Sequence, residues 1–140
     1  MGKIYTALGL MSGTSMDGVD ASIIQSDGNK EYRTILDKYF EYNNDFHKKL
    51  LKIRSKVIVK DDLQTYFDDI KSVEREITIF HANAVNEIIE KIKIEIDFLG
   101  FHGQTIFHDS INGITKQLGD GKLLSKLTKK LVIYNFRQYL

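Results

Sequence analysis

The spacing of apolar residues changes near residue 42, and this change constrains the fold of the 140-residue chain more than any other feature. Before it, three short segments have the apolar runs of strands, at 3–10, 19–26 and 31–42. After it, apolar residues recur every three or four positions, as on one face of a helix. Strands that precede helices and further strands predict an α/β domain.

The first three strands are joined by tight connections. Met11 to Gly18 is rich in glycine, serine and aspartate, and Asp27-Gly28 is a strong turn signal. Strands with such short connections predict an antiparallel three-stranded meander.

Two helices are predicted after the meander. Asn44 is a plausible N-cap for the first. The second spans about 70–93, with one apolar stripe made by Val73, Ile77, Phe80, Ala84, Ile88 and Ile92. His81 lies near this stripe, and we interpret it as a hydrogen-bonded histidine at the edge of the core.

The last part of the chain alternates strands with helices. Residues 96–101 form a compact apolar run after a helix, as in a buried parallel strand. A weak strand at 114–118, a helix at 122–128 and a strand at 131–134 follow. Together with the meander they predict a mixed sheet with flanking helices. The final strand leads into nothing further, so we expect the chain to be one part of a larger fold.

Composition excludes several classes of function. The 20 basic and 19 acidic residues give a net charge of +1, which offers no electrostatic case for nucleic acid or an anionic membrane as partner. The absence of cysteine removes disulfides and thiol catalysis. No apolar stretch approaches the ~20 residues that cross a bilayer, and no targeting segment is recognisable. We therefore expect a cytoplasmic protein.

The first candidate site is the turn between the first two strands. Glycine lets a backbone approach a ligand closely, and successive N–H groups of such a turn can cradle phosphate oxygens. Asp17 or Asp20 could hold Mg²⁺ directly or through water. The segment is neither a Walker loop nor the dinucleotide fingerprint. The alternative is an ordinary hairpin loop, which the same residue types populate.

The second candidate site is Gly100-Phe-His-Gly-Gln-Thr105, at the carboxyl end of the buried strand, where ligands of open α/β sheets gather. His102 could be a general acid or a hydrogen-bond donor, and Gln104 and Thr105 suit sugar hydroxyls or phosphate. The alternative is a loop histidine without a role. Asp120 precedes a predicted helix, where it could cap the helix or face a ligand.

Four segments, in order, resemble the anhydro-N-acetylmuramic acid kinases. The most specific is Gly9-Leu-Met-Ser-Gly-Thr-Ser-Met-Asp-Gly-Val-Asp20, which is similar to the opening signature of that family. The others are Gly100-Phe-His-Gly-Gln-Thr-Ile-Phe-His108, Gln117-Leu-Gly-Asp-Gly121 and Asn135-Phe-Arg137. The resemblance runs from about residue 4 to 137.

The resemblance implies a ribonuclease-H-like lobe of a two-lobed kinase that uses ATP with Mg²⁺. Its reaction would open the anhydro bridge of an amino sugar with water and transfer the γ-phosphoryl group, giving N-acetylmuramic acid 6-phosphate during cell-wall recycling. The phosphate-binding turn would comprise Gly13, Thr14, Ser15, Met16, Asp17, Gly18, Val19 and Asp20. The sugar side would comprise His102, Gln104, Thr105, Asp120 and Arg137.

The departures from the family pattern bear on activity. Asn135 stands where the family has an aspartate, and the resemblance implies that the general base and the second lobe belong to later segments. We therefore expect residues 1–140 to form a single N-terminal lobe with negligible kinase activity alone. Its partner would be a separately encoded second lobe or a second copy. The alternative is a truncated, non-catalytic relic or a phosphate- or sugar-binding module.

Overall fold

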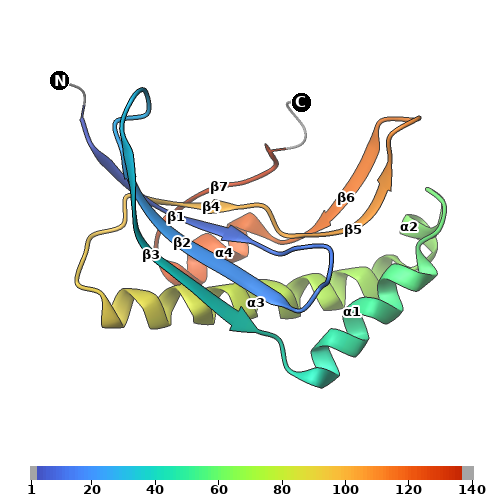
Figure 1. Ribbon diagram of the computed structural model, residues 1–140. Helices are drawn as coiled ribbons and strands as arrows, with labels where there is room; N and C mark the ends of the chain where they lie inside the picture. The colour runs from blue at the N-terminus through green and yellow to red at the C-terminus, as the bar shows by residue number, and fades with distance from the viewer. Residues whose placement is uncertain (1–2, 137–140) are drawn as a thin grey trace.

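The computed structural model describes residues 3–136 (Figure 1). Within them, five strands form one sheet in the order β3-β2-β1-β4-β7, and β5 and β6 form a second sheet. The elements in chain order are β1 (Tyr5–Met11), β2 (Gly18–Ser26), β3 (Tyr32–Glu41), α1 (Asn44–Lys56), α2 (Asp62–Thr65), α3 (Phe67–Lys91), β4 (Phe98–Phe101), β5 (Gln104–Asp109), β6 (Ile114–Leu118), α4 (Gly121–Thr128) and β7 (Leu131–Ile133).

The five-stranded sheet is mixed. Strand β2 is antiparallel to β1 and to β3, with a register shift between Ile23 and Ile24. Strand β1 is parallel to β4, and β4 is parallel to β7. The prediction of an α/β fold with a mixed sheet and flanking helices is therefore confirmed.

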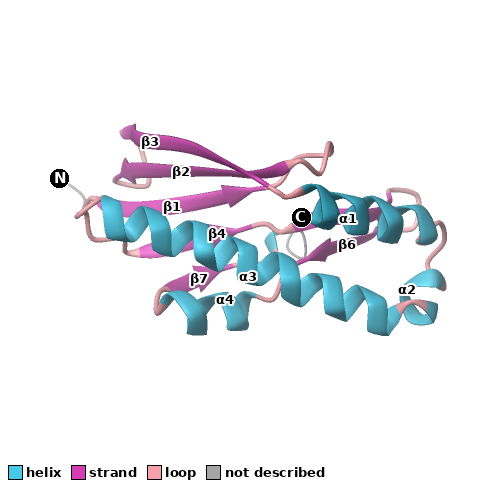
Figure 2. Ribbon diagram, turned by 90° about the horizontal axis from the view of Figure 1, so that it is seen from below, coloured by secondary structure: helices cyan, strands magenta, loops and turns pink. Residues whose placement is uncertain are grey.

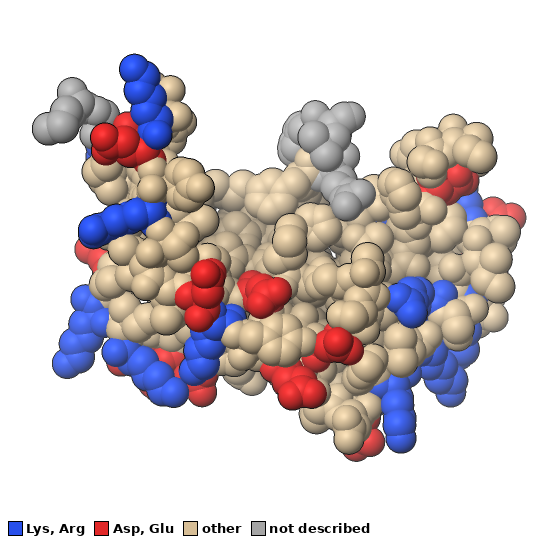
Figure 3. Space-filling view, viewed as in Figure 1, with Lys and Arg blue, Asp and Glu red and all other residues tan. Residues whose placement is uncertain are grey.

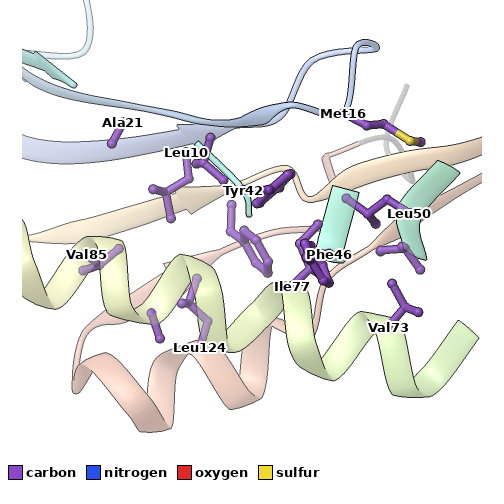
Figure 4. Packing of buried hydrophobic residues seen from close by; sticks show 14 of the residues in the cluster. Leu10, Met16, Ala21, Tyr42, Phe46, Leu50, Val73, Ile77, Val85 and Leu124 are labelled. Atoms are coloured by element: carbon purple, nitrogen blue, oxygen red, sulfur yellow. The ribbon is translucent and has the colours of Figure 1, made fainter. Parts of the chain in front are cut away.

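The helices cover one face of the sheet. Figure 2 shows α3 running along that face, with α1 and α4 beside it. Side chains from alternate strand positions, such as Leu8, Leu10 and Ile23, are buried there because successive residues of a strand point to opposite faces. They share one core with Ile77 of α3 and Leu124 of α4 (Figure 4). None of the helices in residues 3–136 is long and apolar enough to span a membrane.

The boundaries of two predicted helices are corrected. The N-cap of α1 is Asn43, not Asn44, because the extended backbone of Asn43 lets its side chain accept a hydrogen bond from the N–H of Phe46. Helix α3 begins three residues before the predicted start and ends two residues before the predicted end.

Two elements were not predicted, the short helix α2 and strand β5. Strand β5 pairs with β6 as a hairpin that projects beyond the main sheet (Figure 1). Gly103 makes the connection from β4 possible: its φ is +79°, and a Cβ there would collide with the backbone oxygen of Leu118. The sequence was interpreted as a loop after residue 101 because a short, twisted hairpin strand lacks a long apolar run.

His81 lies deeper than its position in the sequence indicated, because α3 is covered by both the sheet and α4. The side chain is fully buried. Its Nδ1 lies 2.7 Å from the carbonyl oxygen of Ile77, which can only accept, so Nδ1 donates. The imidazole meets the ring of Phe101 edge to face at 5.0 Å between centroids. Burial lowers the pKa of His81 from 6.5 to about 4.

This lowered pKa predicts a pH-dependent stability. Between pH 6.5 and about 4 the unfolded chain binds a proton that the folded chain excludes. The free energy of unfolding is therefore unaffected by His81 protonation above pH 6.5, and it falls as the pH drops toward 4. The loss over this range amounts to roughly 3 kcal/mol. Urea unfolding at pH 7 and pH 4.5 checks it, by comparing the original chain with His81→Leu and His81→Gln.

The variants are expected to lose less unfolding free energy between the two pH values than the original chain. The matched control is His108→Asn, at an exposed position of β5, which should behave like the original chain. Equal losses in the original chain and in both His81 variants would contradict the prediction.

Candidate functional site

The candidate site lies where two parallel strands end together. In the parallel pair, Leu10 of β1 is opposite Phe101 of β4. The turn after β1 and the segment after β4 therefore leave the sheet at the same edge, where open α/β sheets bind ligands. Figure 1 shows the turn (blue) beside the beginning of β5 (orange). Their contact is direct, since Gln104 Nε2 donates to the carbonyl oxygen of Gly13 at 2.9 Å.

Met16 anchors the turn to the hydrophobic core. Its N–H donates to the carbonyl oxygen of Gly13 at 3.2 Å, and its φ is +58°. Its side chain is fully buried and belongs to the same core cluster as Leu50 of α1 (Figure 4). Met16 can therefore offer a ligand only backbone atoms, and its side chain explains why the turn is fixed to the core.

The two glycines of the turn, Gly13 and Gly18, differ in whether a side chain would fit at their positions. A Cβ at Gly18 would collide with the backbone oxygen of Phe40 and lie 2.8 Å from the ring of Tyr39, so Gly18 is required by the packing of β2 on β3. A Cβ at Gly13 would meet no atom within 4 Å. Of the two, only Gly13 leaves open space for the close approach of a ligand.

The remaining residues of the predicted phosphate turn divide between core and surface. Val19 is fully buried in β2, whereas the side chain of Asp20 is exposed. The side chain of Asp17 is 51% exposed and lies 3.8 Å from His47 Nε2, an ion pair when the histidine is protonated. Asp17 also accepts a hydrogen bond at its carbonyl oxygen from the N–H of Tyr42 at 2.8 Å.

Helix α1 adds a residue that the sequence did not indicate. Arg54 Nη1 donates to the carbonyl oxygen of Thr14 at 3.0 Å. No local signal could have found Arg54 or His47, because only the packing of α1 brings them to a turn 40 and 30 residues earlier in the chain.

Among the residues predicted for the sugar side, His102 lines a cavity. It is half-buried, and the cavity, of about 530 Å³, is also lined by Gln117 and Asn135. Thr105 of β5 is half-buried, and its Oγ1 accepts a hydrogen bond from Gln117 Nε2 at 3.2 Å. Gln104 is 1% exposed and faces the turn after β1. Arg137 lies outside the described residues.

Asp120 caps α4, as the first of its two interpretations proposed. Its Oδ1 accepts from the N–H of Leu123 at 3.0 Å. Its own N–H donates to Thr78 Oγ1 at 3.0 Å, and Glu74 Oε2 accepts from the neighbouring Gly119 N–H at 3.1 Å. Two polar side chains of α3 thus fix the segment that enters α4.

Sequence reasoning missed Glu74 and Thr78. The available signal was their position, because they lie one helical turn apart on the buried face of α3, next to the apolar stripe. A buried carboxylate is costly unless it is paired, and here Lys71 and Lys116 lie 3.2 and 3.5 Å away.

Oxygen donors dominate at the turn, and they suit a hard cation such as Mg²⁺. Within residues 3–136 no three histidine, aspartate or glutamate side chains gather closely enough to hold a metal ion unaided.

Comparison with known proteins identifies the family. The family model described as anhydro-N-acetylmuramic acid kinase matches residues 5–139. A protein of that name from Pelagibacter ubique is 56% identical over 138 residues, covering 99% of this chain and 37% of the relative. Its counterparts in Agrobacterium fabrum and Rhizobium etli are 36% and 35% identical, each covering 98% of this chain and 38% of the relative.

The chain therefore spans little more than a third of the length of these relatives. The match begins at residue 5, in β1, and ends at residue 139, so it includes the turn after β1 and the segments that line the cavity. On this basis the chain belongs to the anhydro-N-acetylmuramic acid kinase family.

Proposed function

We propose that this chain is the N-terminal, ATP-phosphate-binding part of an anhydro-N-acetylmuramic acid kinase. The observation that carries the proposal is the anchored turn after β1, which lies at the carboxyl edge of the parallel strands beside the half-exposed Asp17. Within residues 3–136, no hydrogen bond occupies the N–H groups of Thr14 and Ser15. Free amides in a turn are donors for phosphate oxygens.

The architecture agrees with a ribonuclease-H-like lobe. Such a lobe would place an antiparallel β3-β2-β1 unit beside parallel strands, and the sheet has this order with β1, β4 and β7 parallel. We propose a cytoplasmic protein in which this lobe forms one wall of the nucleotide cleft.

Magnesium would enter with the nucleotide. The ion keeps several waters and binds one or two carboxylates plus phosphate oxygens. Asp17 and Asp20 are the exposed carboxylates of the turn and of the strand that follows it. We propose that one of them holds the ion, directly or through water.

The amino sugar would bind in the cavity beside the hairpin. Its volume of about 530 Å³ suits a small molecule. His102, which lines it, is the strongest candidate for a contact with sugar hydroxyls; Thr105 and Asp120 lie nearby with hydrogen bonds already made within the protein. Water would open the anhydro bridge as the freed oxygen takes the phosphoryl group, yielding N-acetylmuramic acid 6-phosphate for cell-wall recycling.

Phosphate binding is tested with Mg²⁺ and pyrophosphate. We expect the backbone amide resonances of Thr14 and Ser15 to shift on titration, because these N–H groups receive the anion. Replacing the carboxylate that holds magnesium, by Asp17→Asn or Asp20→Asn, should weaken binding about tenfold, or about 1.4 kcal/mol.

The matched control is Asp27→Asn, which alters an exposed carboxylate in the turn between β2 and β3. Asparagine can still accept the hydrogen bonds made there, and binding should be unchanged. Shifts confined to residues far from the turn, or no saturable shift, would contradict the proposed function.

Turnover requires more than this lobe. Phosphoryl transfer depends on charge and positioning around the γ-phosphate, and general-base assistance alone contributes about 10²–10⁴-fold. We expect the 140-residue chain alone to form no ADP in a sugar-dependent assay. Sugar-dependent ADP formation that Asp17→Ala abolishes would contradict this expectation. Absence of both turnover and phosphate binding would favour the relic.

The uncovered face of the sheet supports a protein partner. Tyr5 and Met11 of β1 alternate with residues buried under the helices, and they are exposed. Leu131 and Ile133 of β7 are also exposed, the first by 67%. Figure 3 shows charged side chains mainly at the two ends and along the lower edge of this view. We propose that a second lobe or a second copy covers this face.

Self-association follows from this exposed apolar surface. We expect light scattering to show dimers or larger species at tens of micromolar concentration, because association removes the apolar face from water. Leu131→Lys with Ile133→Lys should restore a monomer. The control is Ile111→Lys, in the connection between β5 and β6 at a side chain that is 93% exposed. A monomer at every concentration would argue against this partner surface.

A further inference from the structure

The buried amide of Gln104 has one hydrogen bond. Its side chain is 1% exposed. Because the carbonyl oxygen of Gly13 can only accept, the amide nitrogen must face it, at 2.9 Å. The Oε1 atom is then buried with no partner among the described residues. An apolar side chain would avoid the cost of this unpartnered oxygen. The bond to Gly13 is therefore the interaction that accounts for an amide at this position.

The next peptide of the turn is held in the same way from another element. Arg54 of α1 donates to the carbonyl oxygen of Thr14 at 3.0 Å. Two successive carbonyl groups are thus bound by side chains that come from β5 and α1. Neither side chain is near the turn in sequence: the separations are 91 and 40 residues.

Peptide geometry converts these two contacts into an orientation of N–H groups. In a trans peptide the C=O and N–H bonds point in opposite directions, and residues 3–136 contain no cis peptide. A carbonyl of Gly13 turned toward Gln104 therefore turns the N–H of Thr14 away from it. The contact of Arg54 with the Thr14 carbonyl does the same for the N–H of Ser15.

We propose that Gln104 and Arg54 are positioning residues, which draw two carbonyls of the turn toward the protein and so present the amides of Thr14 and Ser15 to a phosphate oxygen. This inference rests on the proposed function and assigns Gln104 to the phosphate side of the cleft. Without the two side chains, either peptide could rotate and bring a carbonyl oxygen toward the anion, which it would repel.

The test uses a donor that can be switched by pH. In Gln104→Glu the ionised carboxylate cannot donate to the Gly13 carbonyl, whereas the protonated carboxyl can. We expect this variant to bind Mg²⁺-tripolyphosphate about tenfold more weakly than the original chain at pH 8. Its affinity, relative to that of the original chain at each pH, should recover as the pH falls. Gln104→Met, which has no donor, should be weak throughout.

Nearby titratable groups are common to all variants, so the ratio at each pH removes their effect. They are Asp17, His47 and His102. The matched control is Gln25→Glu, at a part-buried glutamine of β2 that donates to Thr6; its ratio should stay near one. A Gln104→Glu variant that binds like the original chain at every pH would overturn the inference while leaving the proposed function in place.

A second readout needs no ligand. The Met16 N–H donates to the same Gly13 carbonyl, so loss of the Gln104 bond should speed its hydrogen exchange about tenfold in Gln104→Met. Arg54→Ala should shift the Ser15 amide resonance of the free protein; the control Arg33→Ala, at an arginine that contacts Gln25, should not. Unchanged exchange and resonances would overturn the inference. Failure of the original chain to bind tripolyphosphate would instead reject the proposed function.

Discussion

The parallel pairing of β1 with β4 is the contact on which the rest of the site depends. Because Leu10 and Phe101 are opposite each other, both strands end at one edge of the sheet. A glycine-rich turn and a histidine-containing segment 91 residues later then meet through Gln104 and Gly13. An antiparallel arrangement would have sent the two segments to opposite edges. The turn after β1 and the segment that leads to the cavity beside His102 are thus neighbours because of strand direction.

Helix α3 supports this edge with buried polar side chains, whose removal from water costs free energy unless they are hydrogen-bonded. Glu74 and Thr78 hold the backbone of Gly119 and Asp120, and His81 is kept neutral among apolar neighbours. A helix that served only as a cover for the sheet would carry aliphatic residues at these positions. Its polar groups instead fix the segment between β6 and α4 at one end of the cavity.

The family match gives the family of this chain, and the structure shows which features the chain contains. The family model covers nearly the whole chain, while the chain covers little more than a third of its relatives. Residues 3–136 contain an anchored turn and a cavity, and the sheet face opposite the helices exposes apolar side chains of β1 and β7. Asn135, at which the sequence departs from the expected family pattern, lines that same cavity.

The sequence by itself determined the α/β class, most strands and helices, and the family, because apolar periodicity and contiguous motifs are local properties. It offered a helix cap as one of two roles for Asp120, and the structure shows that cap. Only the tertiary structure decided that Gln104 faces the turn, that Arg54 reaches Thr14 and that Met16 and His81 are buried. These facts depend on which elements pack together over separations of tens of residues. The hairpin strand β5 was hidden for a related reason: its partner β6 and the positive φ of Gly103, rather than its own residue pattern, make it a strand.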